Sequence, residues 1–364
     1  MHFFISILIF IFILFFYIHL QYQFKTSEDL EIYELDYTTN KNLQEICHLK
    51  QPVLFQIDHL KEAEPFFHSI QNNSKFKHQD INVKDIRDYY KPDVTSVDAI
   101  SLSVSSAFGL METDPKGHFF SENNSDLIRD ENIPFFKMDE YLASPWIIHK
   151  SYDLLFGSKN VHTPLKYHTD TGRFLIISSM NSSGINSDDK LQENYIRIKM
   201  TPWKSRKHLE IKYDYEYYEF WSPINIWKNP PDKIRCLEFD VKEGFIIYIP
   251  AYWFYSIEFP NHNISVASFT YSTTMNMVSN LPNYTLFFMQ QNNIKNLVNT
   301  QNVKNVYSSK ENISNTDENI ERTEEINGKE REQDTERIQE KEKDNESKEI
   351  EKMLSVITKT DQNP

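Results

Sequence analysis

The chain has 364 residues, of which 39% are hydrophobic and 14% aromatic, so it can form one large domain with a substantial core plus further segments. We expect no nucleic-acid partner, because a chain with a formal net charge of -14 repels phosphate backbones. The two cysteines, Cys47 and Cys236, exclude a disulfide framework and a cysteine zinc site, and leave room for one disulfide at most.

An apolar segment, Phe3–Leu20, begins almost at the first residue and is interrupted only by Ser6 and His19. As a helix it would be about 27 Å long, close to the ~30 Å hydrocarbon core of a bilayer. A signal peptide is the competing interpretation, but no Lys or Arg precedes the segment and no small-residue cleavage site follows it. We therefore expect a single-pass anchor within residues 1–24, in an orientation that the flanking charges leave open.

Strand and helix patterns alternate in the next part of the chain. Leu30–Tyr37 alternates apolar and polar residues like a half-buried strand, Asn40–Leu49 has a helical pattern, and Gln51–Phe55 begins another strand.

From Lys61 to Tyr141 the chain is mixed and polar. Here Ile81–Asp85 is expected to be helix or loop, and Leu102–Ala107 to be a strand. Lys137–Ile148 is expected to contain a helix at the entrance of the domain.

The second half of the chain contains further short strand patterns separated by turn signals. These predicted strands are Phe174–Ser178, Tyr195–Met200, Leu237–Val241 and Ile264–Tyr271. Ser182–Asn194 is rich in Asn, Ser and Asp and is predicted to be a loop. Several short strands with few helices indicate an antiparallel barrel or jelly roll.

The most informative segment is Gly244–Tyr255, which reads GFIIYIPAYWFY. It predicts a buried strand that ends at Pro250, followed by a second strand that starts with aromatic residues. Gly244 suits a turn that requires positive φ. The segment resembles the Gly-x-x-x-Tyr-Ile-Pro-x-x-Trp-Trp-His sequence of cupin-like, JmjC-type proteins, a family of Fe(II)- and 2-oxoglutarate-dependent protein hydroxylases. In that family the last His is a metal ligand, and here the position holds Tyr255.

A second match lies at Phe156–Tyr167, and the strand, helix and Pro-led strand between residues 30 and 55 resemble the start of the same domain. In the family, two metal ligands lie in Thr-Pro-x-His-Tyr-Asp. The segment Thr163–Leu165 matches its start and places Lys166 at the His position and His168 at the Asp position. A facial triad consists of two His and one carboxylate, so the resemblance implies an altered metal site.

The chain also contains a shifted frame, because His168-Thr169-Asp170 is itself a His-x-Asp sequence. A shift of two residues keeps the same strand face, which makes this pair geometrically reasonable. The third ligand would then be Tyr255, or the site would have no third ligand. A degenerate, metal-free site and a working site both stay open.

The family also holds the far carboxylate of 2-oxoglutarate with a basic residue inside the barrel. Arg197 and Lys199 lie on a predicted strand, but apolar residues occupy the alternate positions, so we expect both cations to point outward. Lys166 is then the residue expected to bind the carboxylate of an anionic small molecule.

Composition changes sharply beyond residue 291. Lys310–Lys352 contains 16 acidic and 9 basic residues, and its isoleucines do not keep a heptad. Such a segment cannot bury enough apolar surface to offset the entropy of ordering it. We expect residues 291–364 to be a disordered acidic tail rather than a coiled-coil partner site.

Together the resemblance and the residues predict a mainly β fold with helical additions (α+β). They predict a double-stranded β-helix of the cupin/JmjC type over residues 25–290, preceded by a transmembrane helix. The expected function is that of a non-catalytic binding or scaffold module, without a cofactor, held in a membrane by Phe3–Leu20 and open to a protein partner. The alternative is an active Fe(II)/2-oxoglutarate-dependent hydroxylase whose metal ligands are His168, Asp170 and Tyr255.

Overall fold

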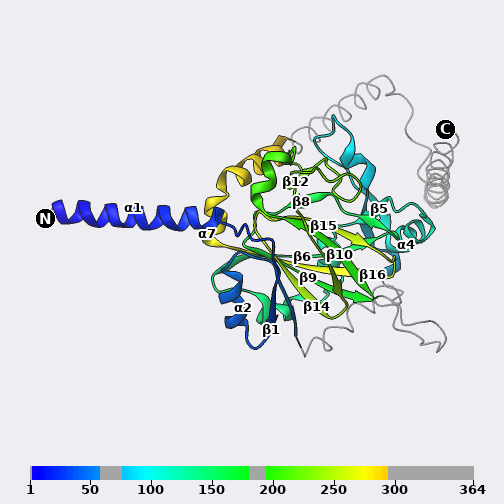
Figure 1. Ribbon diagram of the computed structural model, residues 1–364, viewed down its shortest axis with the longest axis horizontal. Coiled ribbons are helices and arrows are strands. Elements are labelled where there is room, and N and C mark those ends of the chain that lie inside the picture. The colour runs from blue at the N-terminus through cyan, green and yellow to red at the C-terminus, as the bar shows by residue number, and fades with distance from the viewer. Residues whose placement is uncertain (1, 58–75, 180–193, 294–364) are drawn as a thin grey trace, which may run out of the picture. The chain divides into compact units, whose positions relative to one another are not determined.

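The computed structural model describes residues 2–57, 76–179 and 194–293, which form two β-sheets with helices around them (Figure 1). The nine strands of the first sheet are, in spatial order, β1 (Tyr33–Asp36), β2 (Val53–Gln56), β14 (Phe245–Pro250), β9 (Gly172–Ser179), β16 (Ile264–Thr273), β6 (Ile147–Gly157), β5 (Phe119–Ser121), β3 (Asp80–Asp85) and β4 (Ile100–Ser103). The second sheet has the order β11 (Lys212–Asp214), β12 (Glu219–Ser222), β8 (Leu165–Tyr167), β15 (Phe254–Phe259), β10 (Tyr195–Thr201) and β13 (Leu237–Lys242), with β7 (Val161–His162) paired to β15.

The helices lie at the ends and edges of these sheets. The α-helices are α1 (His2–Phe24), α2 (Asn40–Cys47), α4 (Val104–Thr113), α5 (Ser125–Asp130), α6 (Asp139–Leu142) and α7 (Thr274–Ser279), and residues 281–293 continue as a helix. The short 3₁₀ helices are η2 (Phe76–His78), η3 (Ile86–Tyr90), η4 (Phe135–Met138) and η5 (Trp203–His208). The described residues all belong to one unit of the chain, Met1–Asn293.

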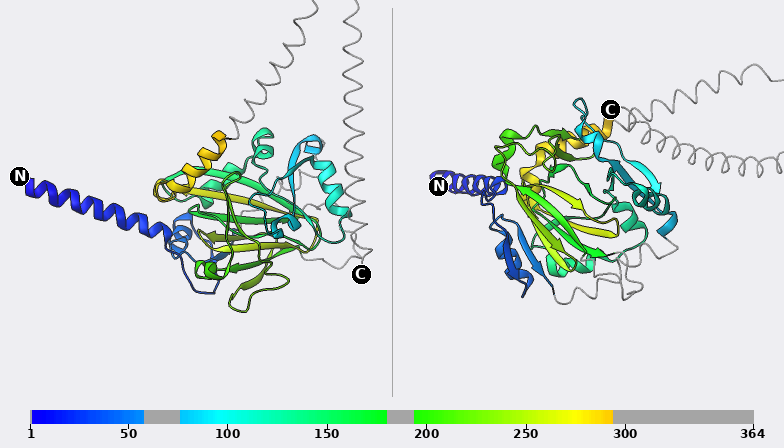
Figure 2. Two further views of the ribbon diagram at one scale, coloured as in Figure 1. Left: turned by 90° about the horizontal axis from the view of Figure 1, so that it is seen from above. Right: turned by 45° about the vertical axis from the view of Figure 1, so that its right-hand side comes forward.

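The two sheets face each other (Figure 2), and residues of both contribute to one apolar core. Leu175 and Ile177 of β9 contribute to it from the first sheet, and Ile196 and Ile198 of β10 and Ile257 of β15 contribute from the second. Alternate residues of a strand share a face, so each sheet presents one apolar face to the other. The predicted mainly β fold with helical additions is confirmed at this level.

Many of the predicted elements lie where their local sequence placed them. The helix α2 and the strands β2, β9, β10, β13, β14, β15 and β16 match the predicted segments to within a few residues. Gly244 has a φ of 83°, and Pro250 is the last residue of β14, as the turn chemistry required. Cys47 and Cys236 are both free thiols.

The segment Ile81–Asp85 was expected to be helix or loop, and this expectation is wrong: it belongs to strand β3. Ile81 and Val83 are buried, as the alternating pattern of a strand requires. Lys84 is also buried, and a charged residue at a buried position interrupts the alternation of apolar and polar residues in the sequence. The expected strand Leu102–Ala107 is only half right, because β4 ends at Ser103, whose side chain caps the start of α4.

The helix expected within Lys137–Ile148 is present as the short helix α6, and strand β6 begins at Ile147. Another prediction differs from the structure in detail. The strand predicted in Leu30–Tyr37 forms as β1, but it is mostly exposed rather than half-buried, because it lies at the edge of its sheet.

Helix α1 is long and apolar enough to cross a membrane, and it is the one such helix in the described part of the chain. These properties fit a membrane span and a signal sequence alike. The end of α1 contacts α7 (Figure 1). The predicted loop Ser182–Asn194, apart from its last residue, and the predicted tail beyond residue 293 lie outside the described residues.

Candidate functional site

Two neighbouring strands of the second sheet bring Lys166 and Tyr255 together. Lys166 on β8 and Tyr255 on β15 are directly opposite each other in the antiparallel register. Both side chains are buried, and Tyr255 belongs to the core cluster between the sheets. Directly opposed residues share a sheet face, so both point into the interior.

Lys166 does not stand alone, because it belongs to a buried network of ion pairs. Its ammonium forms an ion pair with Glu122, whose other carboxylate oxygen lies 3.4 Å from Nζ of Lys84. Lys84 in turn lies 2.5 Å from Glu219 Oε1. Asn123 Nδ2 donates a further hydrogen bond to Glu219 at 2.6 Å. The network therefore balances two ammonium groups with two carboxylates.

The charges of this network are stabilised by one another rather than by water. Burial alone lowers the pKa of Lys84 and Lys166, but the nearby Glu219 and Glu122 carboxylates raise both values above the usual lysine range. Burial alone would raise the pKa of Glu219, whereas Lys84 and Lys166 lower it to about 2. Lys84, Lys166 and Glu219 are thus ionised at neutral pH.

His168 follows β8 and is buried, with its ring directed at the backbone of β14. Its Nε2 lies 3.1 Å from the carbonyl oxygen of Ile249, and since a carbonyl only accepts, Nε2 carries the proton. Among the described residues Nδ1 has no hydrogen-bond partner, and it lies 3.9 Å from Oδ2 of Asp170. Burial, together with the charge of Arg173, lowers the pKa of His168 well below its ordinary value, so the ring is neutral.

Asp170 and Tyr255 each have another partner. Oδ1 of Asp170 accepts a 2.7 Å hydrogen bond from Ser272. The Tyr255 hydroxyl accepts a 2.5 Å hydrogen bond from Nη1 of Arg173. The structure therefore brings His168 and Asp170 close together, while the Tyr255 hydroxyl is paired with a guanidinium group.

Arg173 is the functional candidate that the sequence reasoning missed. It lies on β9, and its Nε donates to Thr270 at 3.1 Å. Within the described residues no carboxylate lies at ion-pair distance from its guanidinium group. Arg173, Leu175 and Ile177 are alternate residues of β9 and share one face of the strand. Because Leu175 and Ile177 are apolar, this alternation could have predicted that Arg173 points into the fold.

Two small cavities adjoin these groups. One of about 230 Å³ is lined by Lys166, His168, Asp170 and Arg173 among others. Another of about 120 Å³ is lined by Lys166, Arg173 and Tyr255 among others. Both cavities are therefore polar spaces lined by two cations and also by carboxylates, Asp170 and Glu219 in the first and Glu122 and Asp153 in the second.

The two basic residues on β10 point away from this site, as predicted. Arg197 forms an ion pair with Asp240 at 3.0 Å, and Lys199 forms one with Glu238 at 3.2 Å, both toward the neighbouring strand β13. They cannot reach a ligand between the sheets.

No protein-family model matches this chain, and no curated protein sequence is significantly similar to it. The function must therefore be argued from the geometry of the site.

Proposed function

We propose that the two sheets are those of a double-stranded β-helix of the cupin/JmjC type. Eight consecutive strands support this, if β7 is counted with β8 and the β11–β12 hairpin is set aside as an insertion. The first, third, sixth and eighth (β6, β9, β14 and β16) are adjacent in one sheet, and the second, fourth, fifth and seventh (β8, β10, β13 and β15) are adjacent in the other. A chain that alternates between two facing sheets in this way is typical of a jelly roll.

We infer that the site does not catalyse metal-dependent oxidation, and that the protein acts as a membrane-anchored binding or scaffold module. The observation that carries this is the ion pair of Lys166 with Glu122 at the position of the first family ligand. An ammonium group cannot ligate a metal, and losing its proton would remove the partner of a buried carboxylate. The described residues contain no group of three His, Cys, Asp or Glu side chains placed to hold a metal ion.

The Tyr255 position adds to this reasoning. The distal ligand of the family is an imidazole, whereas here a phenol accepts a hydrogen bond from Arg173. A guanidinium group 2.5 Å from the Tyr255 hydroxyl would repel a divalent cation bound to that oxygen. The residues present therefore do not fit an Fe(II) facial triad, whose ligands are neutral or anionic.

The module binds, on this proposal, a small anionic ligand in the polar cavities. No carboxylate of the described residues lies at ion-pair distance from Arg173, although Asp170 and Asp153 are near enough to raise its pKa, and planar guanidinium groups suit carboxylates. Lys166 lines the same cavities from the opposite sheet, but Glu122 balances its charge, so Arg173 supplies the attraction for the ligand. Helix α1 would hold the module at a membrane surface.

The alternative, an active hydroxylase, rests on one specific observation. Nδ1 of His168 has a free lone pair 3.9 Å from the Asp170 carboxylate, which is the start of a two-ligand site. With Tyr255 as a third donor it would need the Arg173 guanidinium to move away.

Anaerobic titration of the full-length, detergent-solubilised protein with Fe(II) separates the two functions. We expect no stoichiometric binding at micromolar Fe(II) and no conversion of 2-oxoglutarate to succinate. Stoichiometric binding that is lost in His168→Ala, but kept in the exposed control His208→Ala, would make the hydroxylase the better proposal.

A further inference from the structure

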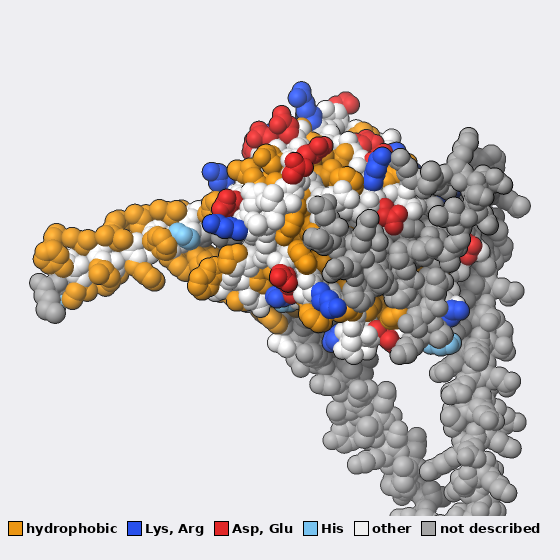
Figure 3. Space-filling model, turned by 90° about the horizontal axis from the view of Figure 1, so that it is seen from below, with side chains coloured by type: hydrophobic (Ala, Val, Ile, Leu, Met, Phe, Trp, Pro, Cys, Tyr) orange, Lys and Arg blue, Asp and Glu red, His pale blue; other side chains and the backbone are white. Residues whose placement is uncertain are grey.

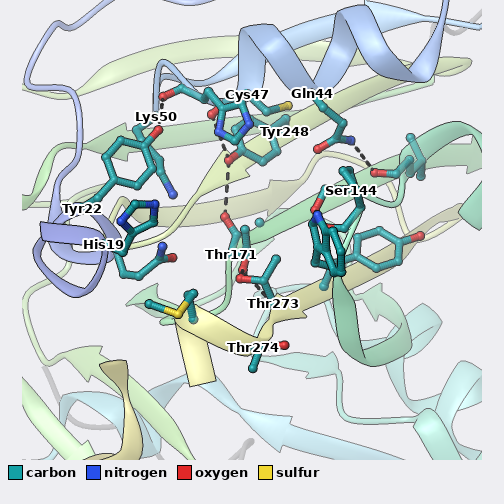
Figure 4. A pocket seen from close by; sticks show the side chains of 18 of the residues that line it. His19, Tyr22, Gln44, Cys47, Lys50, Ser144, Thr171, Tyr248, Thr273 and Thr274 are labelled. Carbon is teal, nitrogen blue, oxygen red and sulfur yellow. Dashed lines mark hydrogen bonds between the residues drawn. The ribbon is translucent and has the colours of Figure 1, made fainter. Parts of the chain in front are cut away.

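A large pocket in the described part of the domain lies where the end of α1 meets the sheets (Figure 4). It measures about 770 Å³, within the range of roughly 300–1,000 Å³ that is usual for small-molecule sites. Its walls come from the last turns of α1, from α2, and from β9, β14 and β16. Most of the lining is apolar and includes Phe174, Tyr248 and Tyr271.

Lys50 is a buried cation that lines this apolar space. Lys50 is only 6% exposed, and its Nζ lies 5.4 Å from the ring centroid of Tyr22 on α1. Figure 4 shows Lys50, Tyr22 and His19 together on one side of the pocket, with Ser144 on the other. In the described residues no carboxylate lies at ion-pair distance from Lys50, and burial lowers the pKa of its ammonium group.

Lys50 is held in place by its backbone. It has a φ of 58°, and its carbonyl oxygen accepts hydrogen bonds from Trp253 Nε1 at 3.2 Å and from the Ser27 amide at 3.1 Å. A left-handed conformation is costly for a residue with a side chain and persists only where the surroundings enforce it. A buried cation held in this way favours an anion as the missing partner.

The surface around the pocket is suited to a bilayer. Apolar side chains continue from α1 onto the adjoining surface of the domain (Figure 3). Trp146, which lines the pocket, is 85% exposed, and Leu49 and Ile148 are exposed as well. Aromatic side chains, Trp above all, are typical of the interface between membrane and water.

We propose that this pocket binds one anionic phospholipid of the membrane that α1 crosses, with an acyl chain against Phe174, Tyr248 and Tyr271 and the phosphate at Lys50. The inference rests on the membrane anchoring proposed above, because α1 forms part of the wall and would place the opening at the bilayer surface. Anionic lipids complement a basic residue at that level.

Native mass spectrometry of the full-length protein in detergent tests this proposal. The micelles are titrated with palmitoyl-oleoyl phosphatidylglycerol or with the phosphatidylcholine that has the same chains. We expect one bound lipid per protein and a preference of about fivefold for phosphatidylglycerol, because both lipids carry the phosphate but the choline cation of phosphatidylcholine offsets its attraction to Lys50; the factor corresponds to the ~1 kcal/mol that a basic residue gains beside anionic lipid. Lys50→Met should abolish the preference, whereas Lys25→Met, which removes an exposed charge just after α1, should retain it.

Variants that fill the pocket supply a second readout. Ser144→Trp and Thr274→Trp should each prevent binding of both lipids, and Ser101→Trp, on the distant edge strand β4, should bind like the wild type. Melting temperatures identify any variant that fails to fold. Lipid retained by both folded pocket-filling variants, or a preference unchanged in Lys50→Met, would overturn the proposal.

Membrane anchoring is tested separately by alkaline carbonate washing. A protein that washes off the membrane but still binds the lipid refutes the anchoring. An integral protein whose Ser144→Trp and Thr274→Trp variants retain the lipid refutes the pocket.

Discussion

Replacing Lys166 by Met tests the buried ion-pair network directly. The substitution keeps the length of the side chain but leaves Glu122 and Glu219 to share the single ammonium of Lys84. The side chains of Lys84 and Glu122 are 1% and 2% exposed, so water cannot solvate the surplus negative charge. Removing one partner of a buried pair costs about 3–5 kcal/mol of unfolding free energy, and we expect a loss in this range.

The double variant Lys166→Met/Glu122→Gln is the decisive comparison. It leaves one ammonium, Lys84, and one carboxylate, Glu219, in balance. Neutral pairs of similar volume are often tolerated where a broken pair is not, so the double variant should recover all but about 1–2 kcal/mol. Lys199→Met is the matched control, because it breaks a more exposed pair that is worth at most about 1 kcal/mol.

The assay is urea unfolding of the full-length protein in detergent, followed by tryptophan fluorescence. A change of midpoint without a change of slope reports stability alone. A loss below about 1 kcal/mol for Lys166→Met would refute the network. A double variant that is no more stable than Lys166→Met would also refute the network.

Four other outcomes follow from the structure. Trp253→Ala should cost about 3–5 kcal/mol in urea unfolding, because this side chain is fully buried; an unchanged midpoint would contradict its packing. Burial lowers the pKa of His162 to about 4, whereas in the unfolded chain it has the ordinary histidine value of ~6.5. The protein should therefore be most stable above pH ~6.5 with respect to this group, and should lose about 3 kcal/mol of unfolding free energy as the pH falls to 4. His162→Gln should flatten that part of the stability profile, and an unaltered profile would exclude His162. The full-length protein should resist carbonate washing because of α1; recovery in the supernatant would rule out the anchor. Tyr255→His alone should not give Fe(II) binding in calorimetry, because Lys166 keeps its ion pair; a stoichiometric isotherm would disprove this.

Local chemistry explains what the sequence predicted correctly. The turn at Gly244 and the end of β14 at Pro250 depend on the properties of those residues alone. Strand β10 was predicted because Ile196 and Ile198 alternate with polar residues, and the same pattern placed Arg197 outside.

The features that were missed depend on residues far apart in the chain. Lys84 is buried in β3 because Glu219, from a distant strand, neutralises it, and no local pattern contains that information. Similarly, the sequence identified Lys166 as a cation but could not show its pairing with Glu122. Arg173 is the exception, because it alternates in register with the core residues Leu175 and Ile177, and this local pattern does predict an inward side chain.

The position of β2 has a consequence for how the chain is made. This strand directly follows the α1–α2 region, yet Val53 pairs with Tyr248 of β14. During synthesis, β2 leaves the ribosome long before its partner exists, and pairing across so long a stretch gives a high contact order and slow folding. Until β14 emerges, the edge of β2 is open to other strands. A chain anchored by α1 would hold that open edge beside the membrane until β14 is made.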